Sequence, residues 1–360
     1  ALGPCLRLHP FREAGRLLLN RAGWRRLTSG VASPFGVDQV YWDLDRALAR
    51  AVHRIASDRL GDSGARGFVY AYDDGADACF AIAKDHGWST VLDLPIAYWR
   101  TMETLLAEEA ERYPDWAPTL EGEAMPEVKR ERKSREYERA DVVVCPSEFV
   151  KRSLPGNTAS KKRIEVIPFG TPCMAMVEAA RIRRPQGNPF KLLFAGRMTQ
   201  RKGLADVFAA MRLLKSRSIE LHVLGEAIMG LEFYRRQFAD FVYHSPRDHG
   251  RVLELMLDCD ALVLPSIVEG RAQVQQEALA CGLPIIVTAN AGAEDLVDKG
   301  ETGHLVSIRS PEAIAEAIEK LVASARGFSA IRNACHERAA RITWHGYRES
   351  LKELATGLLR

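Results

Sequence analysis

The feature that most constrains the fold is a regular alternation in the second half of the chain. Short apolar, β-rich runs are separated there by segments with helical periodicity. Such alternation is typical of a parallel sheet with helices on both faces, that is, of a doubly wound α/β domain. We expect strands at 190–195, 219–224, 239–244, 261–265, 283–288 and 304–306.

The first half shows the same rhythm more weakly, with expected strands at 67–72, 90–94, 141–145 and 164–168. Residues 1–60 are mainly helical in pattern, around 12–26 and 40–57, although a doubly wound domain normally opens with a strand and a tight glycine turn. The N-terminal domain is therefore a candidate for truncation. The segment 93–139 is charged, helix-prone and broken by prolines, so we expect two surface helices joined by a loop, with 127–139 a solvated helix.

A length of 360 residues exceeds what one core usually holds. Loop-like composition between Phe169 and Pro189 marks the expected boundary, which gives an N-terminal domain at 1–170 and a C-terminal domain at 171–342. We therefore predict two Rossmann-like, doubly wound domains.

Composition excludes several classes of protein. With 47% hydrophobic and 27% charged residues, the chain resembles ordinary globular proteins, and no apolar run approaches the roughly 18 residues of a membrane helix. A net charge of +3 is too small for a dedicated nucleic-acid binder. The seven cysteines include no C-x-x-C pair, which favours free thiols and a cytoplasmic location. Because the chain begins at Ala1, the question of a missing natural start stays open.

Common phosphate-binding loops are absent from the sequence. No G-x-G occurs, and the P-loop pattern fails because Arg201 stands where it needs glycine. The strand at 190–195 leads instead into a cation-rich turn that opens a helix, from Gly196-Arg197 to Lys202-Gly203. Cations beside free helix N–H groups suit a diphosphate, although the same residues could be solvated surface cations.

A second group of residues comes after the strand at 261–265. Glu269 stands in the turn at the carboxyl edge of the sheet, and Glu277 lies eight residues on, in a helix from about 272 to 281 that Gly282 caps. Ligands of open α/β sheets bind at this edge. The carboxylates could therefore accept hydrogen bonds from sugar hydroxyls while the amides near Arg271 and Ala272 face a phosphate. The alternative without a ligand is that Glu269 is an acid stabilising the helix N-terminus and Glu277 is an exposed glutamate on the helix.

Together these segments resemble family 4 of the retaining glycosyltransferases, which have the two-domain GT-B fold. The resemblance covers about residues 139–357. It implies that the two domains face each other across a cleft and that the last segment, 343–360, is a helix that returns to the first domain. It rests on the Glu269-x7-Glu277 pair, the cation-rich turn, and these further segments: 140–144 (ADVVV), 146–148 (PSE), 167–170 (IPFG), 282–284 (GLP), 291–294 (AGAE) and Thr302-Gly303.

The resemblance implies roles for the matching positions. Arg197 and Lys202 would hold the donor diphosphate and stabilise its departure, Glu269 would contact the donor sugar, and Glu277 the ribose hydroxyls. Residues that would line the same donor site are Gly196, Gly225, Gly270, Arg271 and Ala272.

Two departures from the family pattern bear on specificity. Small or aromatic residues usually fill positions 271–273, where this chain has Arg271, Ala272 and Gln273. The family often places a histidine near the reacting carbon, whereas the matching segment here reads VLDLP, so Asp93 is the candidate replacement.

We expect no metal. The D-x-D pairs Asp43/Asp45 and Asp258/Asp260 are explained by helix capping and by a position before a strand, and no histidine pair has metal-ligand spacing. Residues 7–27 carry six arginines among leucines and Trp24. This pattern allows peripheral contact with an anionic membrane, but a helix packed on the first domain with its arginines in water is the simpler interpretation.

The sequence thus predicts a cytoplasmic, metal-independent glycosyltransferase. It would move a sugar from a nucleotide-diphosphate donor to an unidentified acceptor, a glycan, a lipid-linked or a small molecule, with retention of configuration. Catalysis would be mainly electrostatic. Alternatives are another GT-B enzyme such as a nucleotide-sugar epimerase, or a non-catalytic nucleotide-sugar-binding subunit.

Overall fold

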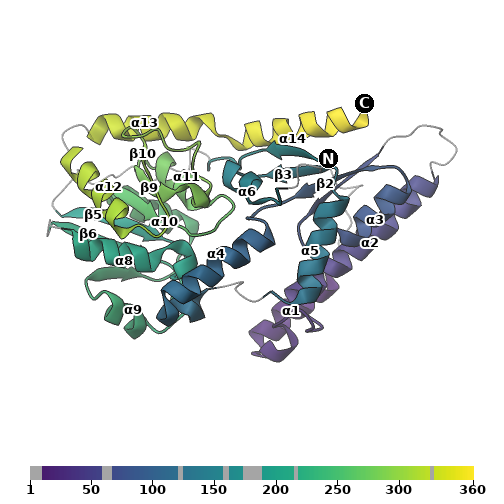
Figure 1. Ribbon diagram of the computed structural model, residues 1–360, viewed down its shortest axis with the longest axis horizontal. Helices are drawn as coiled ribbons and strands as arrows, with labels where there is room; N and C mark the ends of the chain where they lie inside the picture. The colour runs from purple at the N-terminus through teal and green to yellow at the C-terminus, as the bar shows by residue number, and fades with distance from the viewer. Residues whose placement is uncertain are drawn as a thin grey trace.

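The computed structural model describes residues 10–58, 67–120, 125–156, 162–172, 189–214, 218–324 and 328–360. These residues form two separate parallel sheets, each with its own set of helices (Figure 1). The fold class expected from the strand–helix alternation is thereby confirmed.

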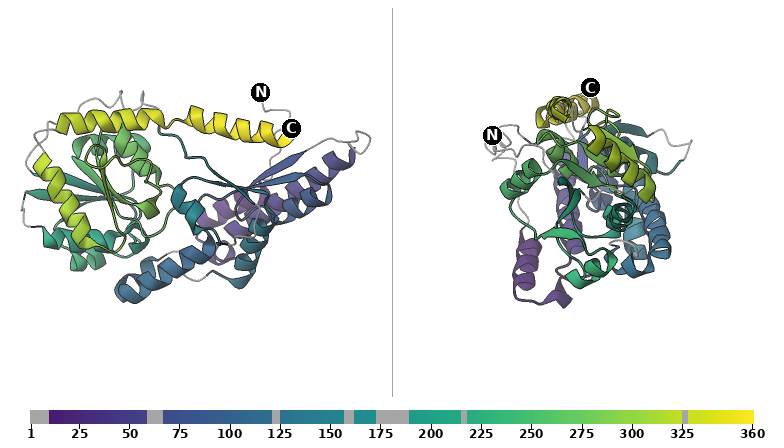
Figure 2. Two further views of the ribbon diagram at one scale, coloured as in Figure 1. Left: turned by 45° about the horizontal axis from the view of Figure 1, so that its top comes forward. Right: turned by 90° about the vertical axis from the view of Figure 1, so that its left-hand side faces the viewer.

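The first sheet has the strand order β1-β2-β3-β4. Its strands are β1 (Phe68–Tyr72), β2 (Ser89–Asp93), β3 (Val142–Cys145) and β4 (Arg163–Val166). One face is covered by packed helices, and α14 (Trp344–Leu359) lies on the other, where Leu354 shares a buried cluster with Val91 and Val142 (Figure 2). The other helices of the first half are α1 (Phe11–Arg21), η2 (Arg25–Leu27), α2 (Val37–Asp58), α3 (Asp77–Asp85), α4 (Trp99–Arg112), η3 (Pro114–Thr119), α5 (Glu127–Arg139) and α6 (Glu148–Ser153).

The second sheet has the order β10-β9-β8-β5-β6-β7, so the chain reverses direction across the sheet between β7 and β8. Its strands are β5 (Phe190–Ala195), β6 (Ile219–Leu224), β7 (Phe241–His244), β8 (Ala261–Leu264), β9 (Ile285–Thr288) and β10 (Gly303–Val306). Its helices are η4 (Gln200–Lys202), α8 (Leu204–Leu213), α9 (Leu231–Gln237), α10 (His249–Asp258), α11 (Gln273–Ala280), η5 (Ala289–Ala291), α12 (Pro311–Ala323) and α13 (Phe328–Arg341).

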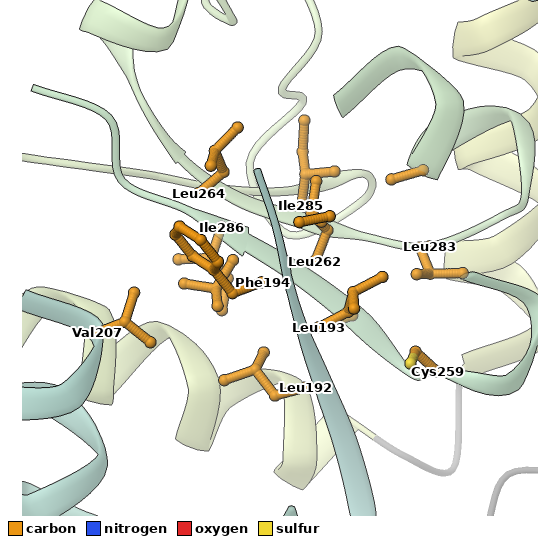
Figure 3. Close-up of a cluster of buried hydrophobic side chains, with 14 of the residues drawn as sticks. Leu192, Leu193, Phe194, Val207, Cys259, Leu262, Leu264, Leu283, Ile285 and Ile286 are labelled. Carbon is orange, nitrogen blue, oxygen red and sulfur yellow. The ribbon is translucent and has the colours of Figure 1, made fainter. Parts of the chain in front are cut away.

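Each strand expected from the sequence is present, with its ends within two residues of the expected ones. The reason is visible in the core of the second sheet, where Leu193, Leu262 and Ile285 from the neighbouring strands β5, β8 and β9 lie together (Figure 3). Because a parallel strand is buried on both faces, its sequence is a nearly continuous apolar run that stands out between polar helices.

Helix α5 differs from the solvated helix expected at 127–139. Lys133 and Glu136 are buried, and Lys133 forms an ion pair with Asp73 at the end of β1. The Glu136 carboxylate accepts hydrogen bonds from the backbone amides of Asp74, at 2.8 Å, and Ala76, at 3.0 Å. The expectation was wrong because mixed charges along a helix do not reveal which of them find buried partners.

The chain crosses between the two sheets at residues 167–172 and returns at 342–344. These two passes lie against each other: the Thr171 amide donates to the Ile342 carbonyl oxygen at 2.8 Å, and Phe169 stacks on Trp344 with ring centroids 6.3 Å apart. A Cβ on Gly170 would lie 2.1 Å from the Trp344 nitrogen. Only glycine allows this approach.

A third connection is non-covalent. Residues 105–119, the end of α4 together with η3, extend from the first domain and lie against the second; we call this segment the arm (Figure 1). Trp116, expected in a loop between surface helices, is buried among Phe208, Phe233 and Tyr234 of the second core.

Candidate active site

Two glycine turns form the floor of the candidate site, after β5 and after β6. Gly196 has φ 156° and Gly225 has φ 151°, and a Cβ on Gly225 would lie 1.9 Å from the Gly196 carbonyl oxygen. The carboxyl ends of the two strands therefore meet without intervening side chains, as in other α/β sheets that bind ligands at this edge.

The cation-rich turn places Lys202 in η4, before Gly203 opens α8 in a left-handed conformation. The Lys202 ammonium forms an ion pair with the Glu269 carboxylate. The Arg201 guanidinium lies 3.5 Å from the same carboxylate oxygen, Oε1. The structure thus joins the two predicted residues Lys202 and Glu269 and adds Arg201, which the sequence pattern marks only as the residue that breaks a P-loop.

Arg197 lies in the same turn, but its side chain is more exposed to solvent than that of Lys202. The Arg197 side chain is 44% exposed, and its Nε donates to Glu226 Oε2 at 3.1 Å. Its guanidinium is therefore accessible from solvent, whereas Lys202 and Glu269 are largely enclosed.

The turn after β8 touches the first domain. The Ser147 hydroxyl donates to the Gly270 carbonyl oxygen at 2.6 Å, and the Ala97 amide lies 3.4 Å from the Glu269 carbonyl oxygen. A Cβ on Gly270 would lie 1.6 Å from the Pro95 carbonyl oxygen. Loops of both domains consequently meet beside the Lys202–Glu269 pair.

Arg271 and Ala272 differ from expectation. The Arg271 guanidinium is buried and binds Asp295 in a bidentate ion pair at 2.7 and 3.0 Å, and its Nε donates to Gln276. The Ala272 amide donates to the Ala291 carbonyl oxygen at 3.2 Å. Both groups are engaged inside the protein, so the idea that the Ala272 amide faces a phosphate is not supported. No local pattern indicates that Asp295, 24 residues on, binds this arginine.

Glu277 lies in the second turn of α11, and Gly282 ends this segment with φ 68°, as expected. Glu277 Oε1 lies 3.1 Å from His249 Nε2, and the Glu277 side chain is 16% exposed. Glu277 is therefore not the freely exposed helical glutamate that the alternative without a ligand predicts. His249, at the start of α10, is not identifiable from the sequence because its partner is distant in the chain.

Asp93 ends β2 on the face covered by α14. It is buried and accepts a hydrogen bond from the Tyr70 hydroxyl at 2.8 Å. Burial raises the pKa of this carboxyl above its usual value, although the hydrogen bond from Tyr70 opposes the shift. The four residues after Asp93 lead directly to the contact with Glu269 and Gly270.

The acidic pairs have structural partners. Asp45 lies within α2 and accepts the amides of Ala78 and Cys79, so it caps α3 and not its own helix. Asp258 pairs with Lys191, and Asp260 accepts the Lys191 amide. Within the described residues no group of three or more His, Cys, Asp or Glu side chains is arranged to hold a metal ion.

Chemically, the site brings Lys202, Arg201 and the Glu269 carboxylate together at one sheet edge, and Glu277 lies further along α11. Lys202 and Arg201 can neutralise a polyanion, and carboxylates such as Glu269 and Glu277 can accept hydrogen bonds from neighbouring hydroxyls. A phosphorylated sugar or nucleotide has both features.

Solved structures share the two-domain fold. Sucrose-phosphate synthase from Thermosynechococcus elongatus superposes with a TM-score of 0.65 at 20% identity, covering 88% of this chain and 79% of that one. Anabaena Alr3699/HepE, solved in complex with UDP, gives a TM-score of 0.62 at 16% identity over 86% and 83% of the two chains. The chain has the GT-B fold.

Sequence comparisons match the chain to glycosyl transferases. Residues 178–341 match the family model described as Glycosyl transferases group 1. D-inositol 3-phosphate glycosyltransferase from Paenarthrobacter aurescens is 30% identical over 220 residues, which cover 54% of each chain. Glycogen synthase from Mycobacterium tuberculosis is 27% identical over 300 residues, 80% of this chain and 68% of that protein. The chain thus spans about half the length of the first of these relatives.

Proposed function

We propose that the protein is a retaining glycosyltransferase of family 4 that transfers a sugar from a nucleotide-diphosphate donor to an acceptor, without a metal or another cofactor. The observation that carries this proposal is the joint contact of Lys202 and Arg201 with Glu269 at the point where the two domains meet. The match of residues 178–341 to group 1 glycosyl transferases supports it.

In this proposal Lys202 and Arg197, joined by Arg201, bind the diphosphate, and Glu269 orients the donor sugar. Charge develops on the diphosphate as the glycosidic bond breaks, so fixed cations stabilise the transition state more than the bound substrate. Glu277 accepts hydrogen bonds from the ribose, and the turns at Gly196, Gly225 and Gly270 line the donor site at the sheet edge. The acceptor is not assigned.

Nucleotide binding followed by product analysis tests this function. UDP, GDP and ADP are titrated calorimetrically into the wild-type protein, and the matching nucleotide sugars are incubated with candidate glycan, lipid-linked and small-molecule acceptors. We expect one nucleotide to bind, the anomeric configuration of the product to be retained by NMR, and EDTA to leave transfer intact. Lys202→Ala should abolish most nucleotide binding. Lys191→Ala should not, because Lys191 lies on β5 and pairs with Asp258.

The outcomes separate the alternatives. A donor epimer released without glycosylated acceptor would indicate a nucleotide-sugar epimerase, and tight binding without any turnover would indicate a non-catalytic subunit. If none of the three nucleotides binds, the proposed function is wrong.

A specific observation favours peripheral membrane contact as an additional property. Helix α1 has its apolar side chains outward: Phe11 is 81% exposed and Leu18 is 69% exposed. Arg12 instead faces Asp43 of α2, and Arg16 pairs with Glu13. Arg12 and Arg16 thus differ from the expected helix with its arginines in water, whereas Arg21 is exposed as expected. Residues 7–9 of the segment 7–27 lie outside the described residues.

The exposed apolar face of α1 is continued by Trp24, which is 63% exposed, and flanked by the exposed Arg21 and Arg26. Aromatic and aliphatic side chains beside arginines suit an anionic lipid surface. No helix in the described part of the chain is long and apolar enough to cross a membrane. We therefore propose that α1 lies on an anionic membrane surface.

Vesicle flotation tests the membrane contact. The protein should float with vesicles of phosphatidylcholine and phosphatidylglycerol but not with phosphatidylcholine alone. Leu18→Glu should remain in the bottom fraction of the gradient. Leu213→Glu, on the exposed side of α8, should float with the vesicles like the wild type. Equal flotation of both variants would exclude α1 as the contact, and concentration-dependent dimerisation lost in Leu18→Glu would identify a second copy as its partner.

A further inference from the structure

The arm, residues 105–119, ends beside the cation-rich turn of the other domain. The Thr119 hydroxyl accepts the backbone amide of Gln200 at 3.1 Å, and the Glu109 carboxylate accepts from Gln200 Nε2 at 2.7 Å. All three residues are fully buried. Gln200 directly precedes Arg201 and Lys202, so the arm contacts the residue on which their placement depends.

The side chain of Gln200 is held at every polar position. Its Nε2 donates to Asp206 at 2.8 Å as well as to Glu109, and its Oε1 accepts the Ala205 amide at 2.9 Å. Two carboxylates on the nitrogen side and an amide on the oxygen side leave one orientation of the carboxamide. Gln200 is therefore a fixed point between the arm and the turn.

The ring of Trp116 connects the arm to the other end of the same turn. It packs on Tyr234 with centroids 5.6 Å apart, and the Tyr234 hydroxyl donates to the Met198 carbonyl oxygen at 2.6 Å. The arm thus supports the turn at Met198 as well as at Gln200.

Arg309 anchors the arm from the loop before α12. It forms ion pairs with Glu109 and, at 2.6 Å, with Glu108, and it donates to the Leu105 carbonyl oxygen at 3.2 Å. Arg309 has φ 61°, a left-handed conformation that is unfavourable for a residue with a side chain. The contacts with the arm hold it there.

We propose that Glu109 and Thr119 are positioning residues for the donor diphosphate: through Gln200 they hold Arg201 and Lys202 against Glu269. The affinity of the second domain for phosphate then depends on contact with the first. This inference rests on the proposed function, because it assumes that Arg201 and Lys202 face the diphosphate.

The test compares two affinities in each variant, because a purely structural role would not change their ratio. UDP, GDP and ADP are tested in turn, and the one that binds is titrated alongside its monophosphate into Thr119→Val, Thr119→Ser and Glu109→Gln. Thr119→Val removes the hydroxyl that accepts from Gln200 and donates to the Trp116 carbonyl oxygen, and it should weaken diphosphate binding by roughly three- to tenfold. Glu109→Gln, which also removes the charge paired with Arg309, should weaken it by roughly tenfold. Monophosphate binding should change less. Thr119→Ser, which keeps the hydroxyl, should restore the wild-type ratio.

Glu108→Gln is the matched control for Glu109→Gln, since Glu108 also pairs with Arg309, at 2.6 Å, but its side chain is 48% exposed. It should leave both affinities unchanged. An unchanged ratio in folded Thr119→Val and Glu109→Gln overturns the inference, even if both variants are less stable.

Hydrogen exchange on the wild-type protein covers the case in which these variants do not fold. The nucleoside diphosphate should slow amide exchange at 105–119, although these residues do not touch the ligand; unchanged exchange overturns the inference. Lys202→Ala distinguishes a failure of the proposed function from a failure of the inferred role of the arm. If Lys202→Ala loses affinity while Thr119→Val keeps it, only the role of the arm is wrong. If Lys202→Ala binds normally, the proposed function itself fails.

Discussion

At the scale of single residues, the contact between the domains depends on the missing side chain of Gly270. Its Cβ would lie 1.6 Å from the Pro95 carbonyl oxygen, and both groups are backbone or next to it, so neither can rotate away. Any larger residue must separate the turn after β8 from the turn after β2.

We therefore expect Gly270→Ala to lower the free energy of unfolding by about 1–3 kcal/mol, the usual cost of overpacking. Nucleotide binding should weaken with it, because Glu269 is the adjacent residue. Gly230→Ala is the control: no atom lies within 4 Å of its Cβ position, and its φ is −58°. Urea unfolding of both variants decides, and equal stability of the two would show that the contact yields without cost.

Glu277 gives a second prediction at this scale. Removing a charged hydrogen-bond partner typically costs about 1.5–3 kcal/mol, so Glu277→Ala should weaken nucleotide binding by roughly 10- to 150-fold. Glu277→Gln should lose less. Glu254→Ala, an exposed glutamate on α10, should bind as the wild type. Calorimetric titration, with circular dichroism to verify folding, measures all three; unchanged affinity in Glu277→Ala would remove the ribose assignment.

Part of the candidate site can be located from the sequence because spacing along one strand–turn–helix unit is local information. Glu269, Glu277 and the Gly282 cap are predictable from the end of β8 and the period of α11. Arg201, His249 and the burial of Arg271 cannot be found this way. Each depends on a partner from a different element, Glu269, Glu277 and Asp295 respectively, and such pairings exist only in the folded chain.

At the scale of elements, the neighbouring strands β6 and β7 carry a pair of stacked histidines. His222 Nδ1 and His244 Nε2 lie 2.9 Å apart, and their rings are nearly parallel. Burial, together with His222 and Arg247, lowers the pKa of His244 to about 4, and burial also lowers the pKa of His222 although Glu220 opposes it. Both rings are therefore neutral in the folded protein near neutral pH.

This pair predicts a loss of stability in mild acid. The unfolded chain takes up a proton on His244 near its ordinary pKa of 6.5, whereas the folded chain does so only near 4. Between these values the unfolded state binds more protons, so the free energy of unfolding falls as the pH drops from about 6.5 towards 4. Urea unfolding at several pH values between 5 and 7 measures the free energy of unfolding. This free energy should change less steeply with pH in His244→Gln than in the wild type. His345→Gln, on the exposed side of α14, should keep the wild-type slope.

Elements differ in how readily the sequence reveals them. The strands of the second sheet are recognisable because apolar runs buried on both faces are distinctive. Helix α5 is recognisable as a helix, but its environment is not, because Lys133 and Glu136 are charged residues whose burial is balanced by Asp73 and by the amides of the turn after β1. Charge patterns report solvation only when such partners are absent.

At the scale of the whole molecule, Trp116 links the two domains. It belongs to the arm of the first and is buried in the core of the second. The amino-acid pattern around it, with Pro114 and Pro118 on either side, indicates only a loop, and the residues of the second domain that receive the ring, Phe208, Phe233 and Tyr234, lie far along the chain. Contacts of this range are not encoded in local periodicity.

We expect Trp116→Ala to cost about 3–5 kcal/mol of stability, as is usual for a large side chain removed from a core. Because the lost contacts are in the second domain, residues of that domain should become more susceptible to proteolysis. Trp24→Ala removes the same number of atoms from an exposed position and should change stability by less than about 0.5 kcal/mol. Chemical denaturation of the two variants measures the difference, and similar midpoints would show that Trp116 is not a core residue.

The crossing at Gly170 and Trp344 has a mechanical consequence. Both covalent passes between the domains meet there, near the junction of α13 and α14, while the arm lies on the opposite side of the molecule (Figures 1 and 2). A rotation about a pivot displaces each point in proportion to its distance from the axis. The bonds of the arm to Arg309 and Gln200 therefore act with a long lever and resist opening more effectively than equal bonds beside the pivot. Any given opening angle would therefore displace the contacts of the arm further than the contacts beside Gly170 and Trp344.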